Sequence, residues 1–317
     1  MMFMEPRAYL EITRPHNCLM GGLTVVSSVQ VAKVFYGVFF LNWFWPRFWI
    51  FPNRFWEMGV LAYFVYVFIA AAGNVVNDIY DVEVDKVNKP NRPLPRGAMS
   101  VREAKVLAGV LWGAGCALAF LISIPSGVLA VIFSTVGLLY AAKVKVLGLL
   151  GNFVVSFSFA FGYIYGSLVV SGEFGLFSLP IIVILFFLTA FCVLQGREII
   201  KVMEDVEGDV LRDAKTIARV YGLKIASYAG VAFNVAGIVC FTLCPVIDRL
   251  GAWWIRALGF WFYPFYFPGV IAVGASTALI LIRYASREAQ SKASLLDKIG
   301  AFFGILAFLA GPYSSGW

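Results

Sequence analysis

Histidine is almost missing from this sequence, and charged residues are scarce. His16 is the only histidine among 317 residues, and Asp, Glu, Lys and Arg together account for 14% of the chain. A single imidazole excludes a metal or haem centre built on histidine ligands. So few charged side chains cannot form the polar surface of a water-soluble domain of this length, which excludes that class of protein.

Cysteine shows no pattern typical of a disulfide framework or a zinc site. The five cysteines lie within or beside apolar segments, where cysteine packs as a small apolar residue: Cys18, Cys116, Cys192, Cys240 and Cys244. The first residues lack a compact basic stretch followed by an apolar core. We therefore expect no cleavable signal peptide.

Apolar residues dominate what is present, at 61% of the chain with a mean hydropathy of +0.84. A membrane-spanning helix needs about 20 mostly apolar residues. The sequence predicts an all-α integral membrane protein, a bundle of about nine transmembrane helices in a single domain over residues 1–317. The nine predicted segments are 9–34, 57–82, 101–123, 126–142, 148–170, 179–200, 220–246, 260–283 and 296–312.

The basic residues are distributed unequally between the two ends of these segments. If the connections alternate between two sides, 20 of the 25 Lys and Arg residues share the side of the N-terminus, and four lie on the other. Cytoplasmic loops carry such an excess, so we predict a multi-pass cell-membrane protein with a cytoplasmic N-terminus and an external C-terminus. This bias explains the net charge of +7 without nucleic acid. Two external segments rich in Trp, Phe and Tyr, 35–56 and 253–267, are predicted to lie at the membrane interface.

Acidic residues concentrate in two short windows, which hold 11 of the 18 and lie at the cytoplasmic ends of predicted spans. Their spacing is regular, because Asn77, Asp81 and Asp85 are four residues apart, and so are Lys201, Asp205 and Asp209. Residues four apart share one face of a helix. Each window therefore presents a ladder of oxygen ligands, which suits a hard cation such as Mg²⁺. The alternative is a pair of solvated helix ends whose acids pair with Lys and Arg.

A basic loop follows the first ladder. Lys86, Lys89, Arg92 and Arg96 lie in the stretch DKVNKPNRPLPRG, whose prolines and glycine predict a loop. Cations beside a carboxylate–metal cluster suit a polyphosphate ligand. The general bias toward basic cytoplasmic loops is the alternative explanation.

At these residues the chain resembles the UbiA superfamily of intramembrane prenyltransferases. The family motif NDxxDxxxD appears as residues 77–85 and is followed by a family-like NKPNRPLPRG, and the motif KxxxDxxxD appears at 201–209. The opening from Arg14 to Asn17, and Tyr140 followed by Lys143, are also similar to the family. Two positions depart from it: Arg197 replaces a common Tyr, and Val202 stands where relatives often add an acid.

The resemblance implies Mg²⁺-dependent transfer of an isoprenoid chain from its diphosphate to an acceptor, at a site toward the cytoplasm. It implies two Mg²⁺ ions, with metal ligands Asn77, Asp78, Asp81 and Asp85 in the first window and Asp205 and Asp209 in the second. Catalytic roles fall to Asp81, Asp205, Lys201 and Tyr140. Tyr140 and Tyr163 are the aromatic candidates for stabilising the allylic cation. Implied substrate-binding residues are Arg14, Asn17, Lys86, Lys89, Arg92, Arg96 and Lys143.

The implied acceptor depends on the branch of the family. The stretches RPHNCLMGGL, GREIIK and EDVEGD look most like the archaeal branch that alkylates geranylgeranylglyceryl phosphate in ether-lipid synthesis. Arg14 and Arg96 are then candidates for binding the acceptor phosphate. The alternative acceptor is an aromatic ring, as in quinone synthesis, and the alternative outside this class is a divalent-cation or phosphate transporter. Beyond the diphosphate, the acceptor and membrane lipids, we expect no obligatory protein partner.

Overall fold

The computed structural model describes residues 5–41, 52–142, 148–173, 175, 177–206, 215–250 and 256–314. Within these residues, nine helices are long and apolar enough to cross a membrane, as predicted. They are contained in α2 (Pro15–Leu41), α4 (Pro52–Tyr80), α6 (Val101–Ile122), α7 (Ile124–Ala142), α8 (Leu149–Glu173), α9 (Ile181–Glu204), α12 (Leu223–Leu250), α13 (Tyr263–Arg283) and α14 (Arg287–Ala310). Shorter elements are α1 (Pro6–Thr13), α5 (Val82–Asn88), α11 (Ile217–Tyr221), η2 (Phe260–Phe262) and η3 (Gly311–Ser314).

Two predicted boundaries differ from the structure. The first predicted span is broken at Arg14, which has a left-handed φ of 51° and separates α1 from α2. Pro15 explains the break, because proline disfavours helical geometry in the residue before it. The last span starts at Arg287 instead of 296, because the Ser286 side chain caps the backbone N–H of Ala289. Capping begins a helix in polar sequence, where hydropathy gives no signal.

The described part of the second aromatic segment, 253–267, contains both exposed and buried rings. Phe260 and Trp261 are exposed, as expected at a lipid surface, but Phe262 is fully buried. Its ring lies 5.6 Å from that of Phe241 on α12. The carboxylate of Asp248 accepts backbone hydrogen bonds from residues 257 and 258 and folds the segment inward. Of the first aromatic segment, residues 42–51 lie outside the described part of the chain.

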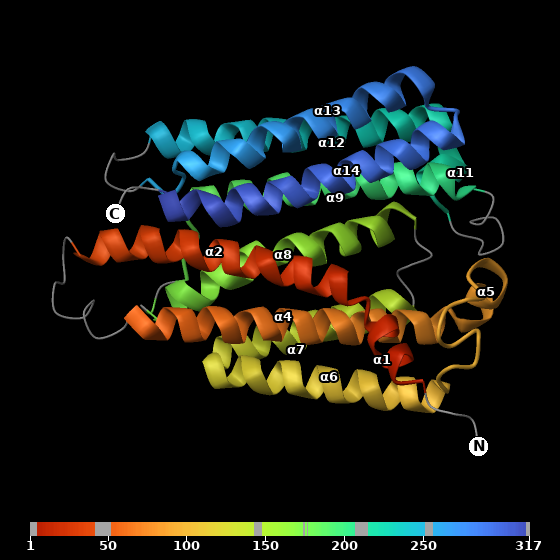
Figure 1. Cartoon of the computed structure of the whole chain (residues 1–317), viewed down its shortest axis with the longest axis horizontal. Coiled ribbons are helices and arrows are strands. Elements are labelled where there is room, and N and C mark those ends of the chain that lie inside the picture. Colours follow the sequence, from red (N-terminus) through yellow and green to blue (C-terminus); the bar gives the residue numbers. More distant parts are fainter. Residues whose placement is uncertain are drawn as a thin grey trace.

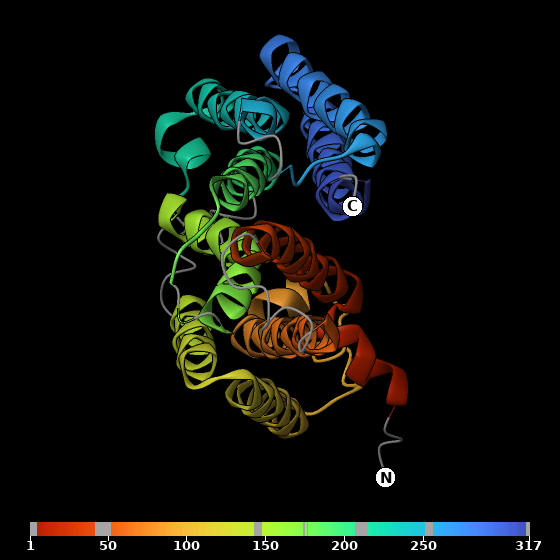
Figure 2. The same cartoon turned by 90° about the vertical axis from the view of Figure 1, so that its left-hand side faces the viewer.

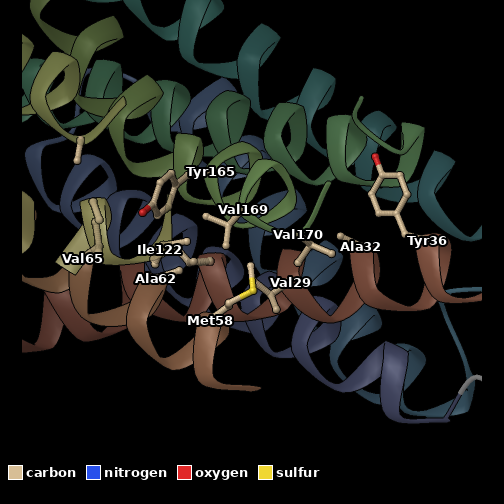
Figure 3. Close-up of a cluster of buried hydrophobic side chains, with 13 residues drawn as sticks. Val29, Ala32, Tyr36, Met58, Ala62, Val65, Ile122, Tyr165, Val169 and Val170 are labelled. Atoms are coloured by element: carbon tan, nitrogen blue, oxygen red, sulfur yellow. The ribbon is translucent and has the colours of Figure 1, made fainter. Parts of the chain in front are cut away.

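Helix α2 lies at the centre of the bundle and packs against α4, α8 and α14 (Figure 2). The cluster in Figure 3 joins Val29 of α2, Met58 and Val65 of α4 and Val169 of α8. Close approach of α2 and α8 depends on Gly166, where an added Cβ would lie 2.3 Å from the Ser28 hydroxyl oxygen. Small residues allow such contacts between helices in membranes.

The two acidic windows lie at the same end of this bundle. Figure 1 shows α5, which carries the end of the first window, and α11, which follows the second window, at one end of the long axis. Helices α4 and α9 lead into the two windows. The packing of each helix within the bundle therefore positions the candidate site.

Candidate active site

The first ladder forms as predicted. The backbone N–H of Asp81 donates to the carbonyl of Asn77 (3.1 Å), that of Asp85 to Asp81 (2.8 Å), and that of Lys89 to Asp85 (2.8 Å). Helical hydrogen bonding thus continues from α4 into α5 although the helix bends at Asp81. Successive residues of the series are therefore about one helical turn apart along the backbone.

An ion network surrounds the buried acids of the first window. Asp78 pairs with Arg14 at the start of α2 and with Arg92 in the loop after α5, at 3.0 Å. Arg92 also donates to Asp85 at 2.5 Å. Asp78 and Asp85 are buried, and buried carboxylates need such partners to remain charged. The network therefore joins α2, α4 and the basic loop around the ladder.

One carboxylate oxygen in this network has no partner in the part of the chain that the structure describes. Asp85 Oδ2 accepts from Arg92, but Asp85 Oδ1 is buried without a hydrogen-bond donor. A buried unpaired carboxylate oxygen is costly, and a bound cation would satisfy it. Among the described residues, however, no three acidic, histidine or cysteine side chains lie together as a metal site. The fit to a hard cation therefore rests on Asp85 and its neighbours in the ladder.

The second ladder is described in part. The backbone N–H of Asp205 donates to Lys201 O at 3.1 Å at the end of α9, and Asp205 itself is exposed. The predicted ligand Asp209 lies outside the described residues. The structure thus shows one turn of this ladder.

Lys89 connects the two ladders. Its pKa is lowered, first by desolvation and then by the nearby positive charges of Arg92 and Lys201. The residue as a whole is exposed, so its desolvation is partial. Lys201 is close enough to Lys89 to lower its pKa, which shows that the second ladder lies next to the first.

The remaining predicted residues lie around this centre. Arg96 binds Glu5 and Glu11 of the N-terminal segment and the carbonyl of Asn91, and it lowers the pKa of Glu11. Lys86 pairs with its neighbour Glu83 at 2.8 Å. In this structure both side chains therefore have partners within the protein.

Asn17, Tyr140 and Lys143 complete the predicted set. Asn17 is exposed in the first turn of α2, and Tyr140 is half-buried in the last turn of α7. Lys143 lies outside the described residues.

Sequence reasoning missed Asn74, which supports the ion network. Its side-chain amide donates to the carbonyl of Thr13 at 2.9 Å and to Cys18 at 3.3 Å. This holds the break at Arg14 against α4. The spacing could have indicated Asn74, because it precedes Asp78 by four residues and so lies one helical turn from it.

Fold and site together define a multi-pass helical membrane protein with carboxylates and cations gathered at one end of the bundle. The chain belongs to the UbiA prenyltransferase family, whose model matches residues 51–308. It is therefore a prenyltransferase, which sets the transporter alternative aside.

Two relatives are similar to this chain over almost its whole length. The digeranylgeranylglyceryl phosphate synthase of Thermococcus kodakarensis is 34% identical over 96% of this chain and 98% of its own. The protein with the same name from Sulfolobus acidocaldarius is 35% identical over 97% of this chain and 98% of its own.

Solved structures share the fold. One of a digeranylgeranylglyceryl phosphate synthase superposes with a TM-score of 0.71 at 28% identity, covering 96% of this chain and 98% of that one. A UbiA homologue from Archaeoglobus fulgidus bound to DMAPP and Mg²⁺ gives a TM-score of 0.62 at 16% identity, over 95% and 98% of the two chains.

Proposed function

We propose that this protein transfers a geranylgeranyl chain from its diphosphate to geranylgeranylglyceryl phosphate, forming the second ether bond of an archaeal lipid. The observation that carries the proposal is the near full-length similarity, at 34% identity, to a digeranylgeranylglyceryl phosphate synthase. The arrangement of the site supports it, because oxygen ligands and cations meet beside an apolar bundle. An aromatic acceptor remains the alternative.

The ladders suit two Mg²⁺ ions. Asn77, Asp81 and Asp85 would hold one, and the unpaired buried Oδ1 of Asp85 supports this assignment. Asp205 and Asp209 would hold the other. When bound, Mg²⁺ neutralises the charge that develops on the departing diphosphate. Asp78, paired with two arginines, is better suited to holding the network than to binding metal.

Lys89 and Lys201 are the strongest candidates for binding diphosphate oxygens. Neither has an ion-pair partner within the described residues, whereas Lys86 and Arg92 pair with acids. Their mutual repulsion, visible in the lowered pKa of Lys89, is relieved when an anion lies between them. The same repulsion makes this point of the site selective for a polyanion.

The transfer forms a bond between the acceptor hydroxyl oxygen and C1 of the isoprenoid, while the bond between C1 and the diphosphate breaks. The bonding electrons leave with the diphosphate, and the hydroxyl proton is released. The allylic carbon must be kept from water, and the apolar interior of the bundle does this. Tyr140, at the inner end of α7, is our candidate for facing that carbon. Tyr163 is fully buried and packs on Phe186 and Phe308, so we assign it to the core.

The test is Mg²⁺-dependent transfer from radiolabelled geranylgeranyl diphosphate in detergent, with geranylgeranylglyceryl phosphate and 4-hydroxybenzoate as parallel acceptors. We expect a labelled diether lipid that disappears with EDTA. A labelled aromatic product alone would instead assign the protein to the quinone branch. Asp81→Ala and Asp205→Ala should each abolish transfer while the protein stays folded in the membrane, and normal turnover in either would remove that residue from the metal site.

A further inference from the structure

Arg197 continues the second ladder into the membrane. It precedes Lys201 by four residues on α9, just as Lys201 precedes Asp205, so all three lie on one side of the helix. One turn of helix places Arg197 about 5.4 Å deeper than Lys201. Because Lys201 interacts with Lys89 of the first window, this side of α9 faces the site.

The Arg197 guanidinium is incompletely paired. Its Nη1 donates to Glu198 at 2.7 Å, but its Nε is buried and has no acceptor among the described residues. The side chain is 23% exposed, so part of it is accessible to a ligand. A guanidinium presents five donors in a planar fork that matches phosphate oxygens, and one of the buried donors here lacks a partner.

The two arginines predicted to bind an acceptor phosphate are already engaged. Arg14 pairs with the buried Asp78, and Arg96 is held by Glu5 and Glu11. Binding phosphate at either would require breaking these contacts. At Nε, Arg197 would bind a phosphate oxygen without losing a hydrogen bond seen in the described residues.

We propose that Arg197 binds the phosphate of the acceptor lipid and selects phosphorylated acceptors. This inference rests on the proposed function. Lys89 and Lys201 hold the donor diphosphate nearer the membrane surface, and Arg197 holds the acceptor phosphate one turn deeper. The glycerol hydroxyl then lies beside C1, where the new ether bond forms. Arg197 accepts no proton and takes no electrons, so its role is to bind and orient.

Asp297 provides the competing explanation for Arg197. It is fully buried on α14 and interacts electrostatically with Arg197. Its Oδ1 accepts from Asn234 at 3.0 Å, and the side chain of Ser276 also stabilises its carboxylate. If Arg197 only neutralises this buried acid, removing its charge would affect every acceptor equally. The experiment must therefore compare acceptors that differ only in the phosphate.

The experiment measures kcat/KM for geranylgeranylglyceryl phosphate and for geranylgeranylglycerol, with geranylgeranyl diphosphate as donor. For Arg197→Gln, we expect kcat/KM to fall about 10- to 100-fold on the phosphorylated acceptor, the effect of losing hydrogen bonds to a charged group. The kcat/KM for geranylgeranylglycerol and the KM for the donor should stay unchanged. Arg197→Lys, which keeps the charge but loses the fork, should give an intermediate preference and serves if the Gln variant does not fold. Lys292→Gln is the control, because Lys292 is an exposed cation that pairs with Glu288 on its own helix.

Each outcome decides between the explanations. A loss confined to the phosphorylated acceptor supports the inference. An equal loss on both acceptors, with the diether still formed by the unsubstituted enzyme, overturns it and assigns Arg197 to Asp297. If the unsubstituted enzyme alkylates neither glycerol lipid, the proposed function fails first, and the role of Arg197 fails with it.

Discussion

At the scale of single residues, the site is governed by which charges already have partners. Asp78, Asp85, Arg14 and Arg92 neutralise one another at the buried end of α4. Lys89 and Lys201 do not pair with acids in the described part of the chain. We expect this division to separate residues that hold the site together from residues that bind a ligand.

Lys89 should give the enzyme a pH dependence of its own. Its lowered pKa means that it loses its positive charge at a lower pH than an ordinary lysine does. As pH rises through that pKa, donor binding should weaken because one diphosphate contact loses its charge. We expect the KM for geranylgeranyl diphosphate to rise in this alkaline range, and Lys89→Gln to have a high KM that no longer changes there.

The control for this measurement is Lys86→Gln, since Lys86 is exposed and pairs with Glu83. A pH profile that Lys89→Gln leaves unaltered would show that another group titrates. The charged neighbours of Lys89 are Arg92, Lys201, Asp85 and Arg14.

Arg14 and Asp78 should be energetically coupled. Arg14→Gln leaves the buried Asp78 with Arg92 as its remaining charged partner, and we expect a loss of about 1–3 kcal/mol in unfolding free energy. Arg14→Gln/Asp78→Asn should lose less than the sum of the single variants, because the unpaired charge is gone. Thermal unfolding in detergent measures this double-mutant cycle, and strictly additive losses would show that the pair is not coupled.

At the scale of elements, the site depends on how α9 packs against its neighbours. Gly196 lies against α12, where an added Cβ would be 2.2 Å from Asn234 Oδ1 and 2.9 Å from the backbone oxygen of Gly230. A side chain here would displace α9, and with it Lys201 and Asp205.

Gly196→Ala is therefore expected to cost about 1–3 kcal/mol by overpacking and to lower kcat. Gly274→Ala on α13 is the matched control, because nothing lies within 4 Å of its added Cβ. Thermal unfolding and turnover of both variants check the prediction. Equal behaviour of the two would show that the contact between α9 and α12 adapts without cost.

At the scale of the whole molecule, an odd number of spans predicts termini on opposite sides of the membrane, and the described residues hold nine candidate spans. We predict a cytoplasmic N-terminus and active site and an external C-terminus, because the basic loops lie at the end that carries the ladders. Reporter proteins that are active on only one side should signal in the cytoplasm when fused to the N-terminus and outside when fused to the C-terminus. Signals on the same side would require an even number of spans.

Prediction from sequence succeeded where the pattern is local. Hydropathy located the spans, and the spacing of Asn77, Asp81 and Asp85 predicted a ladder that backbone hydrogen bonds confirm. It failed where a helix boundary is set by a capping side chain or a backbone break, as at Ser286 and Arg14. Aromatic composition also does not show which rings of 253–267 are buried in the protein, as Phe262 is.

The sequence by itself determined the class of protein, the number of spans and the residue types of the site. Length, hydropathy and four-residue spacing are properties of a single segment, so they need no knowledge of the other segments. Only the tertiary structure decided which cations are engaged, since Arg14 meets Asp78 and Arg96 meets Glu11 across 64 and 85 residues of chain. Such pairings depend on how helices pack, and that packing leaves Arg197 with an unpaired buried donor beside the site.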